Sequence, residues 1–346
     1  MGEQRKILIV DDSRYMRDYL EDLFLSDSRF RVLPSATDPY QAARIISKEA
    51  PDAIALDIEM PRMSGLTFLK KIMRQHPIPV VIVTNQDVKQ IALSLEALSA
   101  GAIDVVSKKD LAPNDEEGRQ DLLEKMWAAA NSRVTRIYPT QPSATNNNHD
   151  ELSLHDSSDK IVMMGASSGG TVVISSILHQ LPPNIPGMII VQHIPEHMSF
   201  LFAKQLNTKT PFYVKEAENG DRVVKNQVLI APGNRHIELC KDVSGYYVRI
   251  TQGPPINHVR PSVDKLFYSA LPYDTGKMYA FLLTGMGQDG AEGLLKLREK
   301  GAYTVAQDEQ SSVIFGMPRA AIEKGAAKAV MSPREMVALI KTVRLK

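Results

Sequence analysis

Short runs of apolar residues recur through the first part of the chain, and segments of helical length separate them. These runs are Lys6–Val10, Ala53–Leu56, Val80–Val83 and Ile103–Val106. A strand that is apolar on both faces is typical of a parallel sheet with helices on each side. Farther on, Leu122, Met126 and Ala130 recur at spacings near 3.6 residues, which predicts a closing helix over Asp115–Ala130. Residues 5–135 are therefore predicted to form a doubly wound α/β domain.

The same alternation resumes at Lys160, after a segment of different composition. Residues 138–158 contain Pro139, Pro142 and the run Asn146-Asn147-Asn148 but few apolar side chains, which is typical of a linker. Because 346 residues exceed what one hydrophobic core usually organises, two domains are expected. We predict one domain over residues 1–135, a flexible linker over 136–157 and a second domain over 158–346.

The second domain is also predicted to be doubly wound α/β. Helical patterns fall over Thr171–Leu178 and Ser199–Leu206. Residues 227–252 alternate apolar and polar side chains around the turn signal Ser244-Gly245, so we expect an antiparallel hairpin that extends the sheet. The strand candidates are Ile161–Met164, Met188–Val191, Val228–Ile230, Tyr247–Ile250 and Ala280–Leu283.

The charge balance argues against some classes of partner. Lys and Arg number 41 against 40 Asp and Glu, so the net charge of +1 gives no general attraction to nucleic acid or anionic membranes. No stretch approaches the roughly 20 apolar residues that cross a bilayer. We expect a cytoplasmic protein that binds no nucleic acid and inserts into no membrane.

Charged and polar residues follow the apolar runs of the first domain: Asp11 and Asp12, Asp57, Thr84 and Lys108. Carboxyl ends of parallel strands meet at one rim of a sheet, so these side chains should converge. Three carboxylates there would repel one another unless a cation shared the site, and Mg²⁺ prefers hard oxygen ligands. We predict that the three aspartates bind Mg²⁺, that Asp57 accepts a phosphoryl group, and that Thr84 and Lys108 hold its oxygens. For Asp12 alone, a helix N-cap or turn role stays open.

The first domain resembles the receiver domain of two-component response regulators, which implies a flavodoxin-like parallel sheet. The resemblance covers about residues 5–130 and rests on Ile9-Val10-Asp11-Asp12-Ser13, Leu56-Asp57-Ile58-Glu59-Met60-Pro61 and Ser107-Lys108. The chain departs from the pattern at Ser64, where many receivers carry Asp, and at Lys109, where Pro is usual. Neither position is among the residues predicted to serve phosphoryl transfer, which we call the phosphate set: Asp11, Asp12, Asp57, Thr84 and Lys108.

A Gly-rich turn, Gly165-Ala166-Ser167-Ser168-Gly169-Gly170, follows the first strand candidate of the second domain. A serine on a sharp turn between strand and helix, with helix amides nearby, is typical of a nucleophile. A phosphate-binding turn has a similar sequence, so an anion cradle stays open as the alternative.

His193 follows the run over residues 188–192 and lies on the same predicted rim. Imidazole is the usual base for a serine hydroxyl, so we predict that His193 activates Ser167. His197 makes an H-x-x-x-H pair with it, which leaves a metal site and a purely structural role as alternatives. Pro195 disfavours a continuous helix across the pair.

Asp289 lies in the turn Gly285-Met286-Gly287-Gln288-Asp289-Gly290, after the strand candidate Ala280–Leu283. An acid there would orient His193 and complete a Ser-His-Asp set. The turn also matches G-x-G-x-x-G, with Asp308 and Glu309 about 20 residues on, so dinucleotide binding is a second interpretation. The turn's place near the end of the chain leaves little room for the rest of a nucleotide-binding half.

The second domain closely resembles the chemotaxis protein-glutamate methylesterases. Beside the three turns, the resemblance rests on Gly253-Pro254-Pro255-Ile256-Asn257, Arg260-Pro261-Ser262-Val263-Asp264 and Phe315-Gly316-Met317-Pro318-Arg319. Family members join a receiver to an esterase through a linker, so the resemblance covers essentially the whole chain except the linker.

The resemblance implies that Ser167 attacks glutamate γ-methyl esters of methyl-accepting chemoreceptors, with His193 as base and Asp289 as its partner. It implies release of methanol, and deamidation of receptor glutamines by the same steps. It points to the Met286 amide as an oxyanion donor, and an amide near Ser168 is a second candidate. A chemotaxis histidine kinase would supply the phosphoryl group, Mg²⁺ would serve the receiver alone, and the esterase reaction would need no cofactor.

Three other functions are compatible with a receiver joined to a second domain. A receiver-controlled transcription factor lacks support, because the second half shows no helix-turn-helix pair with a basic face. An adaptor that only docks is disfavoured by the presence of all three of Ser167, His193 and Asp289. The runner-up is a receiver-controlled esterase or amidase that acts on a protein outside chemotaxis.

Overall fold

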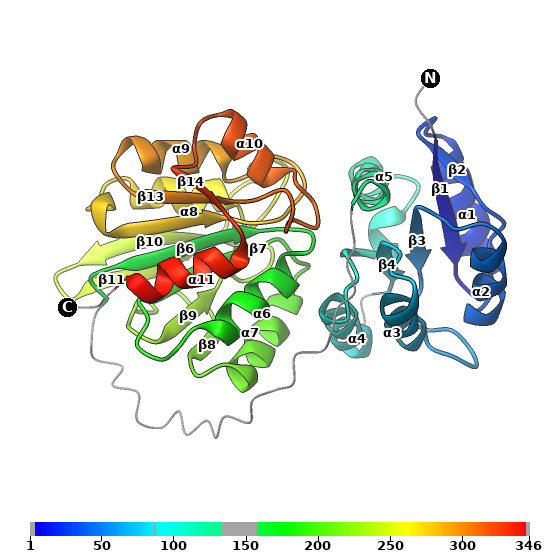
Figure 1. Cartoon of the computed structure of the whole chain (residues 1–346), viewed down its shortest axis with the longest axis horizontal. Coiled ribbons are helices and arrows are strands. Elements are labelled where there is room, and N and C mark those ends of the chain that lie inside the picture. Colours follow the sequence, from blue (N-terminus) through cyan, green and yellow to red (C-terminus); the bar gives the residue numbers. More distant parts are fainter. Residues whose placement is uncertain (1–3, 86–87, 133–157, 344–346) are drawn as a thin grey trace. The chain divides into compact units, whose positions relative to one another are not determined.

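The computed structural model of the protein describes residues 4–85, 88–132 and 158–343, which belong to two compact units (Figure 1). The predicted linker over residues 136–157 lies outside the described residues. Among the helices that are described, none is long and apolar enough to cross a membrane.

The first unit is a five-stranded parallel sheet in the order β2-β1-β3-β4-β5, the flavodoxin-like order. The predicted strands are all present, and a further one, β2, escaped prediction because it has three residues with one of them buried. The strands are β1 (Arg5–Val10), β2 (Phe30–Val32), β3 (Ala53–Leu56), β4 (Val80–Thr84) and β5 (Asp104–Ser107). The helices are α1 (Arg14–Leu25), α2 (Pro39–Lys48), α3 (Gly65–Gln75), α4 (Val88–Ser99) and α5 (Glu116–Ala130).

Local sequence explains where these helices begin. Ser13, Asp38 and Ser64 each accept a hydrogen bond from a backbone amide in the first turn of α1, α2 and α3. The closing helix α5 starts one residue after the predicted position, because Asp115 is its N-cap and accepts from the Gly118 amide at 2.9 Å. Ser64, which departs from the receiver pattern, therefore has a capping role here.

The second unit is built on a seven-stranded sheet in the order β14-β13-β12-β6-β7-β9-β8, with every neighbouring pair parallel. Helices α6, α7 and α11 cover one face, and α8, α9 and α10 cover the other (Figure 1). The strands are β6 (Ile161–Ala166), β7 (Gly187–Gln192), β8 (Tyr213–Glu216), β9 (Gln227–Ile230), β12 (Met278–Leu282), β13 (Tyr303–Gln307) and β14 (Ala329–Met331). The helices are α6 (Gly170–Gln180), α7 (Met198–Lys209), α8 (Val263–Ala270), α9 (Ala291–Glu299), α10 (Met317–Glu323) and α11 (Pro333–Thr342).

The predicted antiparallel hairpin exists as β10 (His236–Asp242) and β11 (Gly245–Thr251). The expectation that it extends the main sheet is wrong, because the two strands form a sheet of their own. The preceding strand β9 has no free edge, since it pairs with β7 on one side and β8 on the other. The hairpin packs instead against α8, where the Leu239 amide donates to Ser269 Oγ at 2.7 Å.

One close approach ties α8 to the central strand of the second unit. A Cβ atom on Gly165, in β6, would lie 2.3 Å from Cγ1 of Val263, the first residue of α8. Only glycine at position 165 lets this end of α8 reach the sheet.

Gly165→Ala should therefore overpack this contact and destabilise the second unit by about 1–3 kcal/mol. Gly253→Ala is the matched control, because its Cβ would meet only His236 Cδ2, at 3.7 Å. Calorimetry of the full chain reports both units, while fluorescence of the single tryptophan, Trp127 in α5, reports the first. Equal effects of the two substitutions would contradict the packing argument.

Candidate functional site

The predicted phosphate set gathers at the carboxyl rim of the first sheet. Lys108 Nζ lies 2.7 Å from both Asp11 Oδ2 and Asp57 Oδ2. Carboxylate oxygens of Asp11, Asp12 and Asp57 lie within 4.8 Å of one another, with Asp12 exposed and the other two buried. Among the described residues this is the one group of three or more acidic, His or Cys side chains with metal-ligand spacing.

The pKa shifts and contacts in this cluster favour the binding of a cation. Burial raises the pKa of Asp11 above its usual range, although Lys108 acts against that rise. Burial lowers the pKa of Lys108, but its interactions with the Asp11 and Asp57 carboxylates outweigh this and the net pKa is raised. Asp11 Oδ2 is buried and pairs with Lys108 by distance, yet it has no hydrogen bond of good geometry. A hard divalent cation such as Mg²⁺ fits that oxygen and its neighbours.

Two further predictions for this rim concern Asp12 and Thr84. The capping interpretation of Asp12 is wrong, because Ser13 is the N-cap of α1 and accepts from the Met16 amide at 3.3 Å. Thr84 is buried at the end of β4, and its hydroxyl donates to Gln90 Oε1 at 3.1 Å. Its predicted contact with phosphate therefore requires that the hydroxyl turn away from Gln90.

At the rim of the second sheet, Ser167 lies in the turn between β6 and α6. The turn is tight: the Gly170 amide donates to Ser167 O at 2.8 Å, and Gly169 has a φ of +76°. Gly285 lets the β12–α9 loop come close, because a Cβ there would lie 2.7 Å from Ser167 Cβ. The glycines of both motifs thus bring two distant turns into contact.

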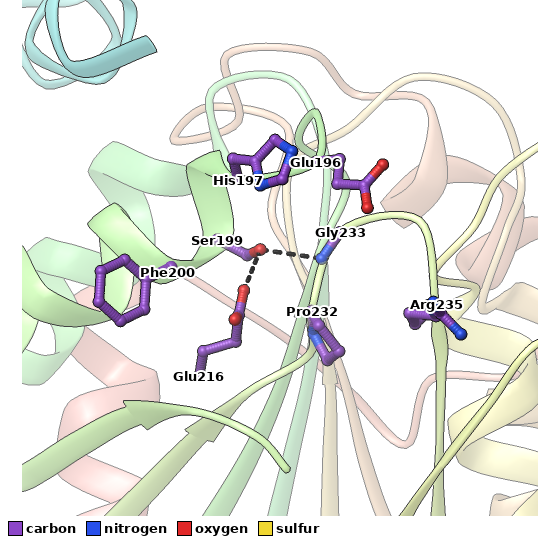
Figure 2. A pocket seen from close by; sticks show the side chains of 8 residues that line it. All are labelled: Glu196, His197, Ser199, Phe200, Glu216, Pro232, Gly233 and Arg235. Carbon is purple, nitrogen blue, oxygen red and sulfur yellow. Dashed lines mark hydrogen bonds between the residues drawn. The ribbon is translucent and has the colours of Figure 1, made fainter. Parts of the chain in front are cut away.

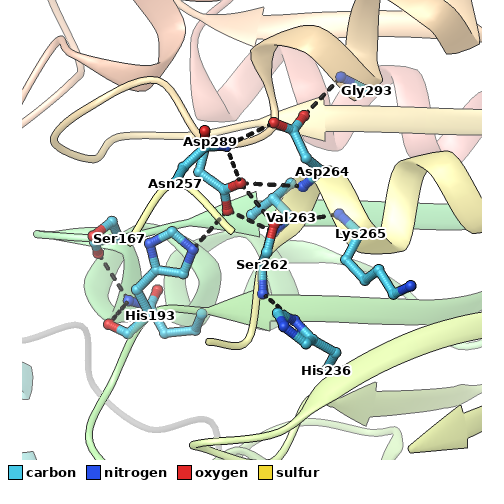
Figure 3. A network of polar contacts seen from close by, with 11 residues as sticks. Ser167, His193, His236, Asn257, Ser262, Val263, Asp264, Lys265, Asp289 and Gly293 are labelled. Carbon is cyan, nitrogen blue, oxygen red and sulfur yellow. Dashed lines mark hydrogen bonds and ion pairs between the residues drawn. The ribbon is translucent and has the colours of Figure 1, made fainter. Parts of the chain in front are cut away.

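His193 and Asp289 come together beside this turn (Figure 3). His193 Nε2 lies 3.0 Å from Asp289 Oδ2. Burial raises the pKa of Asp289, but the hydrogen bonds from His193 and Asn257 outweigh this, and the net pKa is below its usual value. Since an ionised carboxylate only accepts, Nε2 carries a proton in this contact.

Gln192 joins the backbones of the serine and histidine turns. Its Nε2 donates to Ser167 O at 2.8 Å and to His193 O at 3.1 Å. Within the described residues no hydrogen bond joins the Ser167 hydroxyl to the His193 ring. Ser167, His193 and Asp289 are thus gathered at one rim, with the base already paired to the acid and with its other nitrogen uncommitted.

The alternatives for these turns gain no support. His197 makes no three-ligand group with His193 within the described part of the chain. Asp308, the acid of the dinucleotide interpretation, is occupied in its own turn, where it accepts from the Ser311 amide at 3.0 Å. Within the G-x-G-x-x-G segment, Asp289 contacts the His193 ring, which is a role other than nucleotide binding.

The peptide group between Gly285 and Met286 is held in a fixed orientation. Gly285 O accepts from the amides of Gly316 and Met317 at 3.0 and 2.8 Å. Because a trans peptide places N–H opposite C=O, the Met286 amide must point the other way. Ser168 is buried, and its carbonyl accepts from Thr284 Oγ1 at 3.0 Å.

A cavity of about 340 Å³ lies farther along the β7–α7 loop (Figure 2). Its first lining residue along the chain, Glu196, is three positions after His193. None of Ser167, His193 and Asp289 lines the cavity. Ser199 supports its wall by donating to Glu216 at 2.5 Å and accepting from the Gly233 amide at 2.8 Å. The lining residues are Glu196, His197, Ser199, Phe200, Glu216, Pro232, Gly233 and Arg235.

The sequence interpretation missed the residues that surround Asp289. Asn257 and Ser262 donate to Asp289 Oδ1 at 3.0 and 2.8 Å, and the Val263 amide donates to Oδ2 at 2.6 Å. Asn257 and Ser262 belong to segments noted for their resemblance to a family, but nothing in their spacing assigned them a role. They lie 32 and 27 positions from Asp289, so only the fold brings them to it.

Comparison with known proteins gives matches over both units. Residues 162–340 match the family model described as CheB methylesterase, and residues 7–115 match that of the response regulator receiver domain. The protein-glutamate methylesterase/protein-glutamine glutaminase of group 3 operon from Rhodopseudomonas palustris is 43% identical, with 98% of this chain and 97% of that protein covered. The protein-glutamate methylesterase/protein-glutamine glutaminase of Photorhabdus laumondii is 42% identical, over 95% and 94%.

A solved structure also resembles the second unit. It is the crystal structure of the Thermotoga maritima CheB methylesterase catalytic domain, with a TM-score of 0.50 and 35% identity. The match covers 52% of this chain and 98% of that one.

Neutralising Asp11 tests the electrostatics of the first rim. With a raised folded-state pKa, this carboxyl contributes stability below its unfolded pKa, and that contribution is lost as the pH rises through the folded pKa. At pH 7 without Mg²⁺, Asp11→Asn should therefore stabilise the first unit. Added Mg²⁺ should stabilise the wild type more than the variant.

Thermal melts followed by Trp127 fluorescence, with and without Mg²⁺, measure both effects. Asp22→Asn, on the exposed side of α1, is the control and should respond to Mg²⁺ as the wild type does. An Asp11→Asn variant that is less stable without Mg²⁺, and equally stabilised by it, would refute the assignment.

Proposed function

The chain belongs to the CheB methylesterase family and carries a response regulator receiver domain, and from this premise we propose a phosphorylation-activated hydrolase. Its proposed substrates are the glutamate γ-methyl esters of chemoreceptors, from which it releases methanol, and receptor glutamines, which it deamidates. The names of the relatives support both activities. The observation that carries the proposal is the His193–Asp289 pair beside the Ser167 turn.

In the proposed reaction Ser167 Oγ attacks the ester carbonyl carbon while His193 Nδ1 takes the hydroxyl proton. Asp289 fixes this use of the ring by holding the Nε2 proton, and it stabilises the imidazolium that forms. The C–O bond to methoxide then breaks, and the proton on His193 leaves with it as methanol. Water activated by His193 hydrolyses the glutamyl-enzyme and yields the carboxylate. With glutamine as substrate, ammonia leaves in place of methanol.

The negative charge on the carbonyl oxygen needs donors close to Ser167. The Met286 amide is the proposed donor, since the two hydrogen bonds to Gly285 O fix its direction before the reaction begins. The backbone amide of Ser168, at the N-terminal turn leading into α6, is the second candidate. A fixed peptide group costs no reorganisation in the transition state.

In the receiver, Asp57 is the proposed nucleophile toward a phosphoryl group from a histidine kinase. Asp11, Asp12 and Asp57 would hold Mg²⁺, which when bound neutralises charge on the phosphoryl oxygens. Lys108 Nζ donates to Asp57 Oδ2 and, after phosphorylation, would also donate to a phosphoryl oxygen. Thr84 would leave Gln90 to donate to another of its oxygens.

Ser167→Ala tests the hydrolytic half of the proposal. Methanol release from methylated receptor membranes of the same organism should fall at least about 10³-fold, because no other group replaces the nucleophile. Ser176→Ala, on the exposed side of α6, should leave the rate unchanged. Residual release by Ser167→Ala at the wild-type rate would exclude Ser167 as nucleophile.

Asp57→Asn tests the control of that activity. With Mg²⁺ and a small acyl phosphate as donor, wild-type methanol release should rise, and Asp57→Asn should keep only the basal rate. Asp22→Asn serves again as the control and should be stimulated normally. Donor stimulation that persists in Asp57→Asn would place the phosphoryl group elsewhere.

A further inference from the structure

The Asp289 carboxylate receives more hydrogen bonds than a partner for one histidine requires. Beyond the contact with His193, two side chains and two backbone amides surround it (Figure 3). A carboxylate offers about four lone-pair sites, so these donors saturate it. The donors are Asn257 Nδ2 at 3.0 Å, Ser262 Oγ at 2.8 Å, Val263 N at 2.6 Å and Asp264 N at 3.4 Å.

Three of these donors come from the start of α8. Ser262 is the N-cap of this helix, and Val263 and Asp264 are its first two residues. Their amides have no partner within the helix, and the helix dipole places partial positive charge there. Asp289 is only 3% exposed, so neutral donors and this partial charge take the place of water around the anion.

The N-cap itself is held from behind by a buried histidine. His236 Nδ1 accepts from the Ser262 amide at 3.2 Å, while its Nε2 donates to Pro254 O at 3.0 Å. This pattern of one acceptor and one donor fits the neutral ring. Ser262 is fully buried, so its hydroxyl has little freedom to turn away from Asp289.

Asn257 ties Asp289 to a second buried carboxylate. Its Nδ2 donates to Asp264 Oδ2 at 2.9 Å as well as to Asp289 Oδ1, so the two amide hydrogens serve two acids. Asp264 also accepts from the Gly293 amide, in the first turn of α9, at 2.6 Å. Asn257 itself has a φ of +52°, in the left-handed region that asparagine tolerates better than most residues.

We propose that Asn257 and Ser262 are positioning residues for the hydrolytic reaction. They hold the Asp289 carboxylate in the plane and place at which it fixes the His193 ring. This inference rests on the proposed function, because it assigns these residues to the same reaction.

The charges around Asp289 explain why its orientation needs several donors. His193 faces it from the loop after β7, and Asp264 faces it from α8. Burial raises the pKa of Asp264, and the negative charge of Asp289 adds to that rise. The phenol of Tyr268, on α8, has a pKa raised by burial and by both carboxylates and by Glu292. Without the Asn257 amide between them, the two buried carboxylates would repel each other more strongly.

The test compares Asn257→Ala, Asn257→Asp, Ser262→Ala and Ser262→Thr in the full-length protein. Asn257→Asp keeps the shape but removes the N–H donor, and Ser262→Thr keeps both the hydroxyl and the helix cap. Ser332→Ala is the matched control, because it removes the N-cap of α11 in the same unit without touching Asp289. Calorimetry identifies any variant that fails to fold.

The first readout is the kinetics of methanol release. Asn257→Ala, Asn257→Asp and Ser262→Ala should lower kcat by about 10- to 100-fold, because a small displacement of a reacting group has effects of this size. KM of Ser262→Ala should stay within about twofold, since Ser262 is fully buried and cannot contact the receptor. Ser262→Thr and Ser332→Ala should keep kcat near the wild-type value.

The second readout does not depend on activity. In protein labelled with ¹⁵N-histidine, the His193 Nε2–H proton that is donated to Asp289 should give a low-field NMR resonance. This resonance should be retained in Ser262→Thr and Ser332→Ala, and shifted or lost in the three variants that lack a donor. If both the resonance and kcat of folded Asn257→Ala and Ser262→Ala match the wild type, the proposal is wrong.

The two readouts also separate this proposal from the proposed function. A wild type that releases no methanol, while its His193 resonance still depends on Asn257 and Ser262, would refute the substrate and leave the positioning role intact. An active wild type with unaffected variants would do the reverse.

Discussion

The buried negative charge of Asp289 is the constraint on which the arrangement of the second unit's site depends. A carboxylate with 3% exposure is costly unless donors surround it, and the fold supplies them from three separate segments. The start of α8 must therefore reach the β12–α9 turn, and Gly165 and Gly290 allow this, since a Cβ on either would collide with Val263. The glycine turns, the start of α8 and His193 together stabilise the Asp289 anion.

In the first unit a lysine, and not a set of neutral donors, compensates the charge of the buried carboxylates. Asp11 and Asp57 share one cation, Lys108, and Asp11 Oδ2 lacks a well-directed hydrogen bond. Their charge is thus only partly compensated by the chain, which leaves a place for a divalent ion. Asp289 is saturated by hydrogen-bond donors and has no such place. The same residue type is therefore suited to reversible binding of a cation and a phosphoryl group in one unit, and to a fixed orientation in the other.

The sequence predicted the parts of this architecture that depend on local patterns. The apolar runs located the buried strands because each is covered on both faces, and the residues after them indicated the two rims. β2, β8, β13 and β14 escaped prediction. β2 and β14 have three residues each, too few for a pattern, and β8 and β13 are short and carry polar residues. The hairpin was placed in the wrong sheet because the pairing of both edges of β9 is a tertiary fact. Asn257 and Ser262 had no local signal, since their role arises from contacts about 30 positions away along the chain.

Strand order explains why both sets of residues converge at all. In the first sheet β1 lies between β2 and β3, and in the second β6 lies between β12 and β7. At each of these strands the chain connections run to opposite sides, which opens the crevice where open α/β sheets bind their ligands. Asp11 follows β1 with Asp57 on the neighbouring strand end, and Ser167 follows β6 with His193 and Asp289 on its two flanks. Because the topology alone fixes this convergence, residues as distant as 167 and 289 need only correct turns, not a continuous motif, to meet.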